Sequence, residues 1–419
     1  MKQAYVTPII KDFKDDHDDL KNYRPISNLS TLSKILERCM YVQINNYLAE
    51  NSLYCEEQSG YRKGHSCETL LVSMFDDVIK ETDNNNLIAM LLLDLSAAFD
   101  AIDHCTLLNK LEHMYGIQSH ALKLIKSYLE NRSFTVCING KHSSIDILLY
   151  GVPQGSILGP ILFILYTKEL SSIVEKYGIK LKLYADDSTL YLKLNSTSNS
   201  TETESAIIYV QNCLHEIKAW MVCNFMKLND DKTQLLVFGK QYNLNKYPTN
   251  IELNFDGTII NNIDLNDPKM KDKGKSLGVF LKNDTSMTRQ IASVKQSSYN
   301  VLHNLRDIKE YLTEDTKLLL INSLVISKID FCNALYMNIP QYQINILHKL
   351  LNYCIRFIYN LPKRMSVRDY YLKSHILPAK LRIKFKCLLI IHKCLWICTY
   401  VCICNAYWTF AMIIQFHII

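Results

Sequence analysis

Residues 180–194 read KLKLYADDSTLYLKL, and this stretch decides the interpretation of the whole chain. Apolar and polar residues alternate on both sides of two adjacent acids, Asp186 and Asp187. Such alternation is typical of half-buried strands, so the stretch predicts a β-hairpin with the two acids at its turn. Upstream, the continuous apolar run Leu87–Leu93 ends at Asp94 and predicts a short strand buried on both faces.

Three carboxylates at the ends of buried strands can meet in one cleft at the edge of a sheet. A carboxylate in that place is costly unless a positive charge compensates it. Mg²⁺ prefers oxygen ligands, often one or two carboxylates together with substrate phosphates. A pair of such ions can activate an attacking oxygen and neutralise a leaving one, so Asp94, Asp186 and Asp187 suit phosphoryl or nucleotidyl transfer. The alternative for Asp186 and Asp187 is a solvated turn without catalytic function.

The composition indicates a globular protein and excludes a disordered or fibrous one. The chain has 419 residues, 48% of them hydrophobic and 21% charged, so it can form two or three packed subdomains. The 14 cysteines include no C-x-x-C pair, which favours a reduced compartment. The N-terminus contains no apolar stretch typical of a signal peptide. We therefore expect an intracellular protein, in the cytoplasm, the nucleus or both.

The net charge of +6 is distributed unevenly along the chain. Residues 341–393 contain eleven lysine and arginine residues against one acid, Asp369, so the remaining chain is slightly acidic. A basic segment of this kind is typical of a surface that binds a polyanion. A solvated helix face has the same composition and remains the alternative.

Periodicity predicts the remaining elements. Apolar residues recur every three or four positions from Ile26 to Leu48, which predicts a helix with Ser33 as an N-cap. Further helices are predicted at residues 68–81, 103–115, 121–130, 158–174 and 206–225, and about four more at 286–393. Strands are predicted at residues 133–139, 144–150 and 234–238, with a second hairpin at 251–260.

Seven blocks of the sequence resemble motifs of reverse transcriptases, in the same order and with similar spacing. Tyr184-Ala185-Asp186-Asp187 resembles the Y-x-D-D box. The first palm motif is matched by DLSAAFD at 94–100, and the second by GVPQGS at 151–156 with LGP at 158–160. Residues 22–27 and 58–64 resemble finger motifs, residues 220–233 the element after the Y-x-D-D box, and residues 277–279 the grip strand. The chain is most similar to the polymerases of LINE-like retrotransposons, which lack long terminal repeats, over about residues 5–395.

The resemblance implies an α+β right-hand polymerase. We expect fingers at residues 1–86, a palm with an antiparallel sheet at 87–282 with finger elements at about 105–150, and a helical thumb-like region at 283–393. The implied function is an RNA-directed DNA polymerase that adds dNTPs to a primer 3′-hydroxyl. Its cofactor would be Mg²⁺, as two ions, with Mn²⁺ as a substitute. RNA template, DNA primer and dNTPs would be its partners, and no obligate protein partner is expected.

The resemblance also assigns roles around the metal site. Asp94 and Asp186 would hold the two metal ions, Asp187 would support the site, and the carbonyl of Leu95 would complete one coordination shell. Phe99 would block a ribose 2′-hydroxyl and so select dNTPs, unless it is only a core residue. Lys232 would protonate the leaving pyrophosphate, unless it merely pairs with the neighbouring acids at 230 and 231.

Other basic and glycine-flanked residues would contact the substrates. Arg62 would bind the triphosphate from a loop that also contains Lys63, because an Arg fork can bind phosphate oxygens bidentately. Gln154 and Gly155 would line the floor under the templating base pair. Basic thumb residues would hold the backbone of the template–primer; these are Lys363, Arg364, Arg368, Lys380 and Arg382. The alternative for Arg62 and Lys63 is a solvated basic loop. The alternative for Gln154 and Gly155 is a loop that only starts a helix.

Two features depart from the family pattern. The sequence begins just before the first finger motif and has no Cys/His knuckle, so we expect a polymerase core without its own endonuclease. Residues 394–419 contain no Lys, Arg, Asp or Glu, and they are interpreted as an accidental apolar tail or, less favoured, a membrane span. The alternative function is a decayed or domesticated copy that binds nucleic acid without polymerising.

Overall fold

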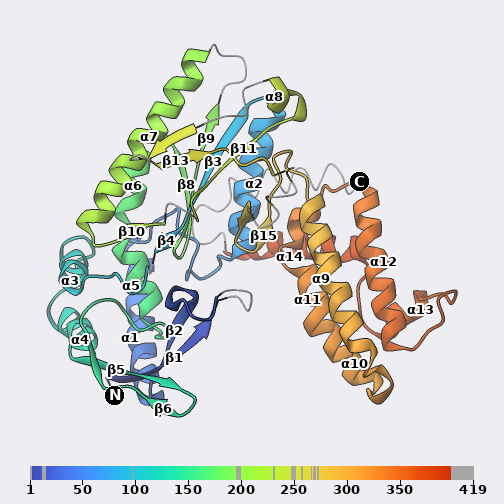
Figure 1. Cartoon of the computed structure of the whole chain (residues 1–419), viewed down its shortest axis with the longest axis horizontal. Coiled ribbons are helices and arrows are strands. Elements are labelled where there is room, and N and C mark those ends of the chain that lie inside the picture. The colour runs from blue at the N-terminus through green and yellow to red at the C-terminus, as the bar shows by residue number, and fades with distance from the viewer. Residues whose placement is uncertain are drawn as a thin grey trace.

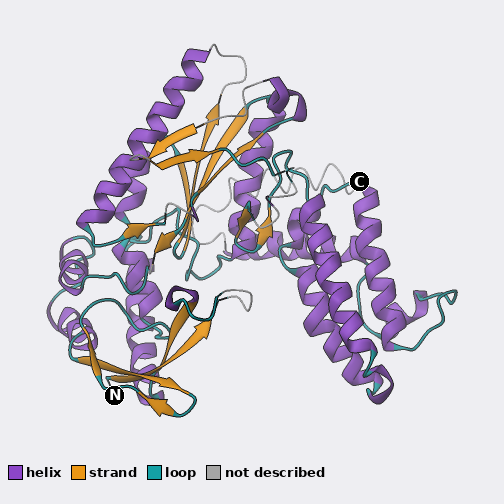
Figure 2. Cartoon of the chain, in the orientation of Figure 1, coloured by secondary structure: helices purple, strands orange, loops and turns teal. Residues whose placement is uncertain are grey.

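The computed structural model describes residues 2–11, 16–96, 98–194, 200–229, 232–246, 252–255, 258–265, 267, 270 and 273–397. Two larger sheets with their flanking helices, three two-stranded sheets and a helical bundle make up this part of the chain (Figure 1 and Figure 2). This mixture of helices and antiparallel strands confirms the predicted α+β class. The predicted turn at 256–257, the acids at 230 and 231, and residues 398–419 of the predicted tail lie outside the described residues.

The central sheet confirms the strands predicted around the acids. Its order is β11-β3-β9-β8, and every neighbouring pair is antiparallel. The four strands are β3 (Leu87–Leu93), β8 (Lys180–Tyr184), β9 (Asp187–Leu194) and β11 (Gln234–Phe238). The hairpin at 180–194 therefore lies beside the buried strand that ends just before Asp94.

Both faces of this sheet are covered, which explains the continuous apolar run in β3. Ala89 and Leu91 belong to one hydrophobic core, whereas Ile88 and Met90 belong to the other. The first core includes residues of α5 (Gly159–Tyr166), α6 (Glu169–Glu175) and α7 (Ser200–Cys223), and the second includes residues of α2 (Cys67–Asp83). Figure 1 shows α2 and α7 on opposite sides of the strands.

A second sheet contains the N-terminal strand. Its order is β2-β1-β5-β6, with β7 also paired to β5, and β1 runs parallel to β5. The strands are β1 (Gln3–Ile10), β2 (Tyr23–Asn28), β5 (Arg132–Ile138), β6 (Lys141–His142) and β7 (Asp146–Leu148). The helices α1 (Thr31–Glu50), α3 (His104–His113) and α4 (Ser119–Leu129) lie in the same region of Figure 1.

Two helix predictions were wrong in their extent. The helix predicted from Ile26 begins at Thr31 and is capped by Ser30, not Ser33, because residues 23–28 pair with β1 as a strand. The helix predicted at 158–174 is interrupted at 167–168, between α5 and α6, where the Thr167 hydroxyl donates to a carbonyl four residues earlier. Such back-bonding by a Thr side chain competes with regular helical hydrogen bonds.

The C-terminal part of the described chain is a helical bundle. It follows four short strands and a short helix: α8 (Gln241–Lys246), β12 (Glu252–Phe255), β13 (Thr258–Asn261), β14 (Lys275–Ser276) and β15 (Val279–Phe280). The bundle helices are α9 (Thr288–Arg306), α10 (Glu314–Ile321), α11 (Ser327–Asp330), α12 (Gln341–Ile358), α13 (Arg368–Lys373) and α14 (Ala379–Ile397). The predicted domain boundaries stay a prediction.

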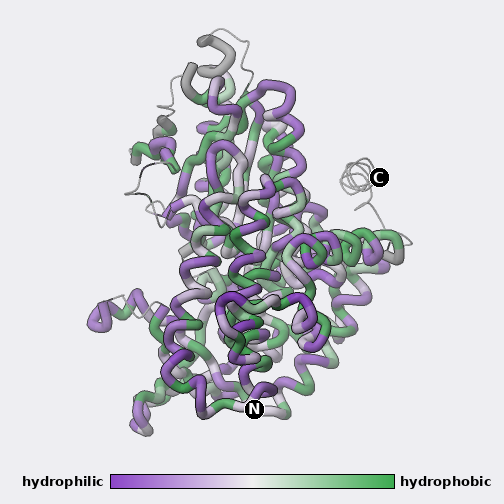
Figure 3. The backbone as a smooth tube through the Cα atoms, turned by 90° about the vertical axis from the view of Figure 1, so that its right-hand side faces the viewer, coloured by the Kyte–Doolittle hydropathy of each residue, from purple (hydrophilic) through white to green (hydrophobic). Residues whose placement is uncertain are grey.

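The last helix of the described chain, α14, extends from the bundle toward α2 (Figure 1). Hydrophobic and hydrophilic residues are interspersed along the described chain (Figure 3). Lys386 in α14 forms an ion pair with Glu68 of α2 at 3.0 Å. The helix includes residues 394–397, the first part of the predicted tail. Within the described ranges, no helix is both long enough and apolar enough to cross a bilayer.

Candidate active site

The structure brings Asp94, Asp186 and Asp187 to the same end of the central sheet. In the β3–β9 ladder Leu93 pairs with Ser188, and in the β8–β9 hairpin Tyr184 pairs with Asp187. Asp94 follows directly after β3, and Asp186 lies in the turn that joins β8 to β9. Strand pairing alone therefore places residues that are 92 positions apart in the sequence beside one another.

The three carboxylates interact electrostatically. Burial raises the pKa of Asp186, the charge of Asp94 raises it further, and the nearby Arg24 opposes this shift. Asp187 keeps solvent access, but desolvation by the surrounding protein and the charges of Asp186 and Asp94 raise its pKa to about 6. The end of the sheet therefore carries more negative charge than its own side chains compensate, which favours a cation.

The donor set suits a hard divalent cation, because all of its side-chain atoms are carboxylate oxygens. Among the described residues, however, no group of three or more His, Cys, Asp or Glu side chains is arranged to hold a metal ion. A Mg²⁺ ion in this place would need further oxygens, such as those of substrate phosphates.

Asp94 is oriented by the segment after α7. The Asn229 side-chain amide donates to Asp94 Oδ2 at 3.2 Å, and the Asn229 main-chain N–H donates to the Asp94 carbonyl at 2.9 Å. The pairing of β4 (Leu95–Ser96) with β10 (Lys227–Leu228) fixes this segment and buries Leu95. Lys232 Nζ lies 3.6 Å from Asp94 Oδ2 on a largely exposed side chain, so a mobile cation is within reach of the carboxylate cluster.

The first and second predicted palm motifs are joined by main-chain hydrogen bonds. Val152 N donates to Phe99 O at 2.9 Å, and Gly151 N donates to Ile102 O at 2.8 Å. The Phe99 ring is half-buried and packs against the Phe163 ring of α5, with 5.0 Å between centroids. The Phe99 ring therefore packs the segment that follows Asp94 against α5.

Gln154 and Gly155 lie where the second motif meets β2. The side-chain amide of Gln154 donates to Asp100 Oδ2 at 2.9 Å, and the main-chain carbonyl of Gln154 accepts from Ser27 N at 2.7 Å. Gly155 has φ +113°, and a Cβ on it would lie 2.9 Å from Ser27 O, so this close approach requires glycine. The structure therefore joins the palm loop to the N-terminal sheet at these residues.

Arg62 and Lys63 are placed differently from one another. The Arg62 guanidinium donates to the carbonyls of Cys55 at 2.7 Å and Gln58 at 3.0 Å, and lies over the Tyr54 ring. Arg62 thus binds its own loop in this structure, and its predicted contact with a triphosphate stays a prediction. Lys63 is exposed.

The five basic residues predicted to bind nucleic acid lie on the helical bundle, but they are not equivalent. Lys363, Arg364, Arg368 and Lys380 are exposed. Arg382 is only 15% exposed at its side chain, and its Nη1 lies 2.5 Å from Asp330 Oδ2. This ion pair ties α14 to α11, so Arg382 has a structural partner that the sequence did not indicate.

Besides Asn229, three residues of the site region were not assigned roles from the sequence. Arg24 acts on the pKa of Asp186, Gln58 bonds to the turn before Asp186, and the buried Glu37 accepts from Ile157 N at 2.7 Å. Arg24 and Gln58 stand inside the blocks that resemble finger motifs, which was the available signal. Glu37 had no signal, because a glutamate on a helix is ordinarily expected at the surface.

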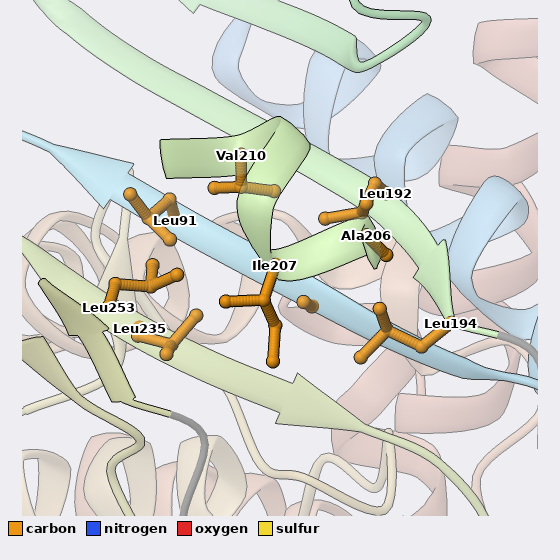
Figure 4. Close-up of a pocket in the computed structure, with 9 residues that line it drawn as sticks. Leu91, Leu192, Leu194, Ala206, Ile207, Val210, Leu235 and Leu253 are labelled. Atoms are coloured by element: carbon orange, nitrogen blue, oxygen red, sulfur yellow. The ribbon is translucent and has the colours of Figure 1, made fainter. Parts of the chain in front are cut away.

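An apolar pocket between α7 and the central sheet is separate from the carboxylate cluster (Figure 4). Its lining contains no polar side chain, so it offers nothing that could bind a phosphate or a metal ion. The lining residues are Ala89, Leu91, Leu192, Leu194, Ala206, Ile207, Val210, Leu235 and Leu253.

Comparison with known proteins agrees with the motifs. Residues 12–281 match the family described as reverse transcriptase (RNA-dependent DNA polymerase). The chain is 29% identical over 237 residues to a probable RNA-directed DNA polymerase from transposon BS of Drosophila melanogaster, covering 55% of this chain and 25% of that protein. It is 26% identical over 359 residues to the RNA-directed DNA polymerase from mobile element jockey of Drosophila funebris, covering 84% of this chain and 37% of that protein. The chain thus spans well under half the length of these relatives.

Among solved structures, an apo telomerase from Candida Tropicalis aligns with a TM-score of 0.44 and 13% identity. The alignment covers 92% of this chain and 66% of that one.

Proposed function

Because the chain belongs to the reverse transcriptase (RNA-dependent DNA polymerase) family, of the LINE-like retrotransposon type, we propose that it extends a DNA primer by copying an RNA template. Its α+β architecture is the right-hand polymerase fold that the motifs predicted. The observation that carries the proposal is the meeting of Asp94, Asp186 and Asp187 at one end of the central sheet. dNTPs would be the second substrate.

The three carboxylates are proposed to hold divalent cations, two Mg²⁺ ions with Mn²⁺ as a substitute. When bound, such ions activate the attacking primer oxygen and neutralise the leaving pyrophosphate. Their fit is supported by the all-oxygen donor set, and by the desolvation and the repulsion from Asp186 and Asp94 that together raise the pKa of Asp187 to about 6. Asn229 holds the Asp94 carboxylate in place through its side-chain amide at 3.2 Å.

Lys232 is proposed to act at the leaving-group side of the site. Its Nζ lies 3.6 Å from Asp94 Oδ2, yet the side chain is 62% exposed, so it can turn toward a pyrophosphate. An ammonium group can stabilise that charge and can also donate a proton. Lys232→Arg separates these two roles, because an arginine keeps the positive charge that stabilises pyrophosphate but does not give up its proton.

Substrate selection is proposed to involve the residues around the joined palm motifs. Phe99 would exclude a 2′-hydroxyl, and Gln154 and Gly155 would lie under the templating base pair. Arg24, whose charge acts on Asp186, and the exposed Lys63 would attract the triphosphate. Arg62 would join them only after releasing the two carbonyls that it binds in this structure.

The template–primer backbone is proposed to lie along the exposed cations of the bundle, which are Lys363, Arg364, Arg368 and Lys380. Such contacts position nucleic acid without reading its sequence, and they weaken as salt rises. Arg382 contributes less, because its guanidinium is held by Asp330.

Primer extension on a primed RNA in Mg²⁺ tests the proposal. We expect dNTP incorporation by the full chain and none by Asp186→Asn. Binding of primed RNA without any extension would favour the second candidate, a copy that binds nucleic acid without polymerising. The family membership of the chain is compatible with both outcomes, so only the assay separates them.

A further inference from the structure

The segment at residues 57–60 runs beside β8, within the hairpin that carries two of the three acids. Ser59 N donates to Leu183 O at 2.8 Å, and Leu183 N donates to Glu57 O at 2.9 Å. These bonds pair the segment with β8 in parallel, with Gln58 opposite Leu183. The segment therefore extends the sheet locally and reaches the hairpin turn.

Gln58 bonds to both main-chain groups of Ala185, the residue that precedes Asp186. Its Nε2 donates to Ala185 O at 3.3 Å, and its Oε1 accepts from Ala185 N at 3.0 Å. Oε1 also accepts from Gly60 N at 2.7 Å. Gln58 is 2% exposed and Ala185 is 9% exposed, so these groups have little access to water that could replace the bonds.

Ala185 has a backbone conformation that needs support. Its φ is +57°, in the left-handed region, which costs a non-glycine residue about 1–2 kcal/mol. Asn and Asp can stabilise that conformation with their own side chains, but alanine has no polar group. The support must therefore come from a neighbour, and the Gln58 carboxamide is placed to provide it.

Gly60 makes the contact with the turn sterically feasible. A Cβ on Gly60 would lie 2.4 Å from Ala185 N and 2.9 Å from Gln58 Oε1. Only a residue without a side chain allows the loop to approach the turn this closely. Gln58 and Gly60 thus act together on one residue of the hairpin.

We propose that Gln58 is a positioning residue for nucleotide addition, which fixes the left-handed backbone of Ala185 and thereby the direction of the Asp186 and Asp187 side chains. The inference rests on the proposed polymerase activity for its kinetic consequence. A small misplacement of groups that hold the reactants is expected to lower the rate of the chemical step. Gln58 itself does not contact the reacting atoms in this account.

Two matched variants of the full chain separate positioning from general stability. Gln58→Met keeps the length of the side chain and removes its hydrogen bonds. Asn283→Leu is the control, because Asn283 is also buried, at 5% exposed, and its side chain also makes two main-chain bonds: Nδ2 donates to Val237 O at 2.7 Å and Oδ1 accepts from Leu265 N at 3.0 Å. Val237 lies at the end of β11 away from the three acids. Both variants should lower the melting temperature by similar amounts.

Single-nucleotide incorporation on primed RNA gives the kinetic readout. We expect Gln58→Met to lower kcat at least about tenfold, equivalent to about 1.36 kcal/mol of transition-state stabilisation, with little change in KM for dNTP. Asn283→Leu should keep its kcat. Equal kcat values for the two variants would overturn the inference and leave the proposed function intact.

Amide hydrogen exchange at Ala185 gives a readout that needs no activity. We expect exchange at this amide to be at least about tenfold faster in Gln58→Met than in Asn283→Leu, because opening of the turn costs about 1.4 kcal/mol less. Unchanged exchange would overturn the inference. If the wild-type chain incorporates no dNTP, the proposed function fails, and the exchange measurement still decides whether Gln58 fixes the turn.

A second variant covers the case in which Gln58→Met does not fold. Gln58→Glu keeps the two accepted bonds and replaces only the donor to Ala185 O. The same two readouts should then change in the same direction by at least about threefold, since the donated bond is lost and the buried carboxylate also repels Ala185 O. No change in either readout would overturn the inference.

Discussion

Replacing Asp187 with asparagine should stabilise the protein in the absence of metal. In the folded chain, desolvation and the charges of Asp186 and Asp94 raise the pKa of Asp187 from 3.8 to about 6. A shift of this size corresponds to at most about 3 kcal/mol. Because the side chain is exposed to solvent, screening reduces the expected effect to about 1 kcal/mol.

The sign of the effect follows from proton linkage. A raised pKa means that the folded chain binds this proton more tightly than the unfolded chain does. Stability is therefore lost as pH rises from about 4 to about 6, and the penalty is fully present above pH 6. Asp187→Asn removes the penalty, so its advantage over the wild type should be full at pH 7.5 and smaller at pH 5.

Urea denaturation in EDTA at the two pH values measures the difference. Asp369→Asn, on the exposed surface of α13, is the control and should change the free energy of unfolding by less than about 0.5 kcal/mol. Added Mg²⁺ should stabilise the wild type more than Asp187→Asn, because ligand binding adds to the stability of the folded state. If Asp187→Asn were no more stable than Asp369→Asn at pH 7.5, the reasoning about the carboxylate cluster would be wrong.

Three further outcomes are expected. Phe99→Ala should let ribonucleotides be incorporated in a mixed-nucleotide extension assay, and unchanged discrimination would remove the proposed gate. Glu37→Gln weakens the charged bond to Ile157 N and should lower the free energy of unfolding by about 1–3 kcal/mol in urea, whereas an unchanged midpoint would contradict its role at the start of α5. Lys380→Ala should reduce by about one the slope of the logarithm of the RNA–DNA binding constant against the logarithm of the salt concentration. Arg382→Ala should mainly lower the free energy of unfolding, because Arg382 is paired with Asp330. Equal effects of the two variants on binding would contradict this difference between an exposed and a paired cation.

The central sheet was predictable from the sequence because its signals are local. The apolar run at 87–93, the alternation at 180–194 and the strand at 234–238 each have a length and pattern that few other structures share. Antiparallel pairing then places Asp94 near the hairpin turn. The three acids could therefore be linked before the structure was known.

The first helix shows where periodicity misleads. Leu32, Ile35 and Leu36 belong to the apolar repeat that predicts this helix, yet they are 66%, 56% and 50% exposed, while Ser33 and Glu37 are buried. The buried face is set by tertiary contacts, because the Glu37 carboxylate accepts main-chain N–H groups of residues 157 and 158. A pattern of apolar residues cannot reveal a partner that lies 120 positions away.

The pairing of basic residues was also beyond the sequence. Arg62 and Arg382 were assigned to substrates because a guanidinium suits phosphate, but each has a protein partner in this structure. Carbonyls of the same loop and an aspartate 52 positions away compete for these groups. Composition identifies a cation, whereas the fold decides which anion or carbonyl it meets.

Cleavage of the chain by bound Fe²⁺ tests the meeting of the three acids most directly. Fe²⁺ can occupy oxygen-rich Mg²⁺ sites, and hydroxyl radicals formed there with ascorbate and peroxide cut the nearby backbone. We expect cuts close to both Asp94 and Asp186, suppressed by excess Mg²⁺ and absent in Asp186→Asn. Cuts at one of these segments without the other, or cuts that persist in Asp186→Asn, would contradict a shared metal site.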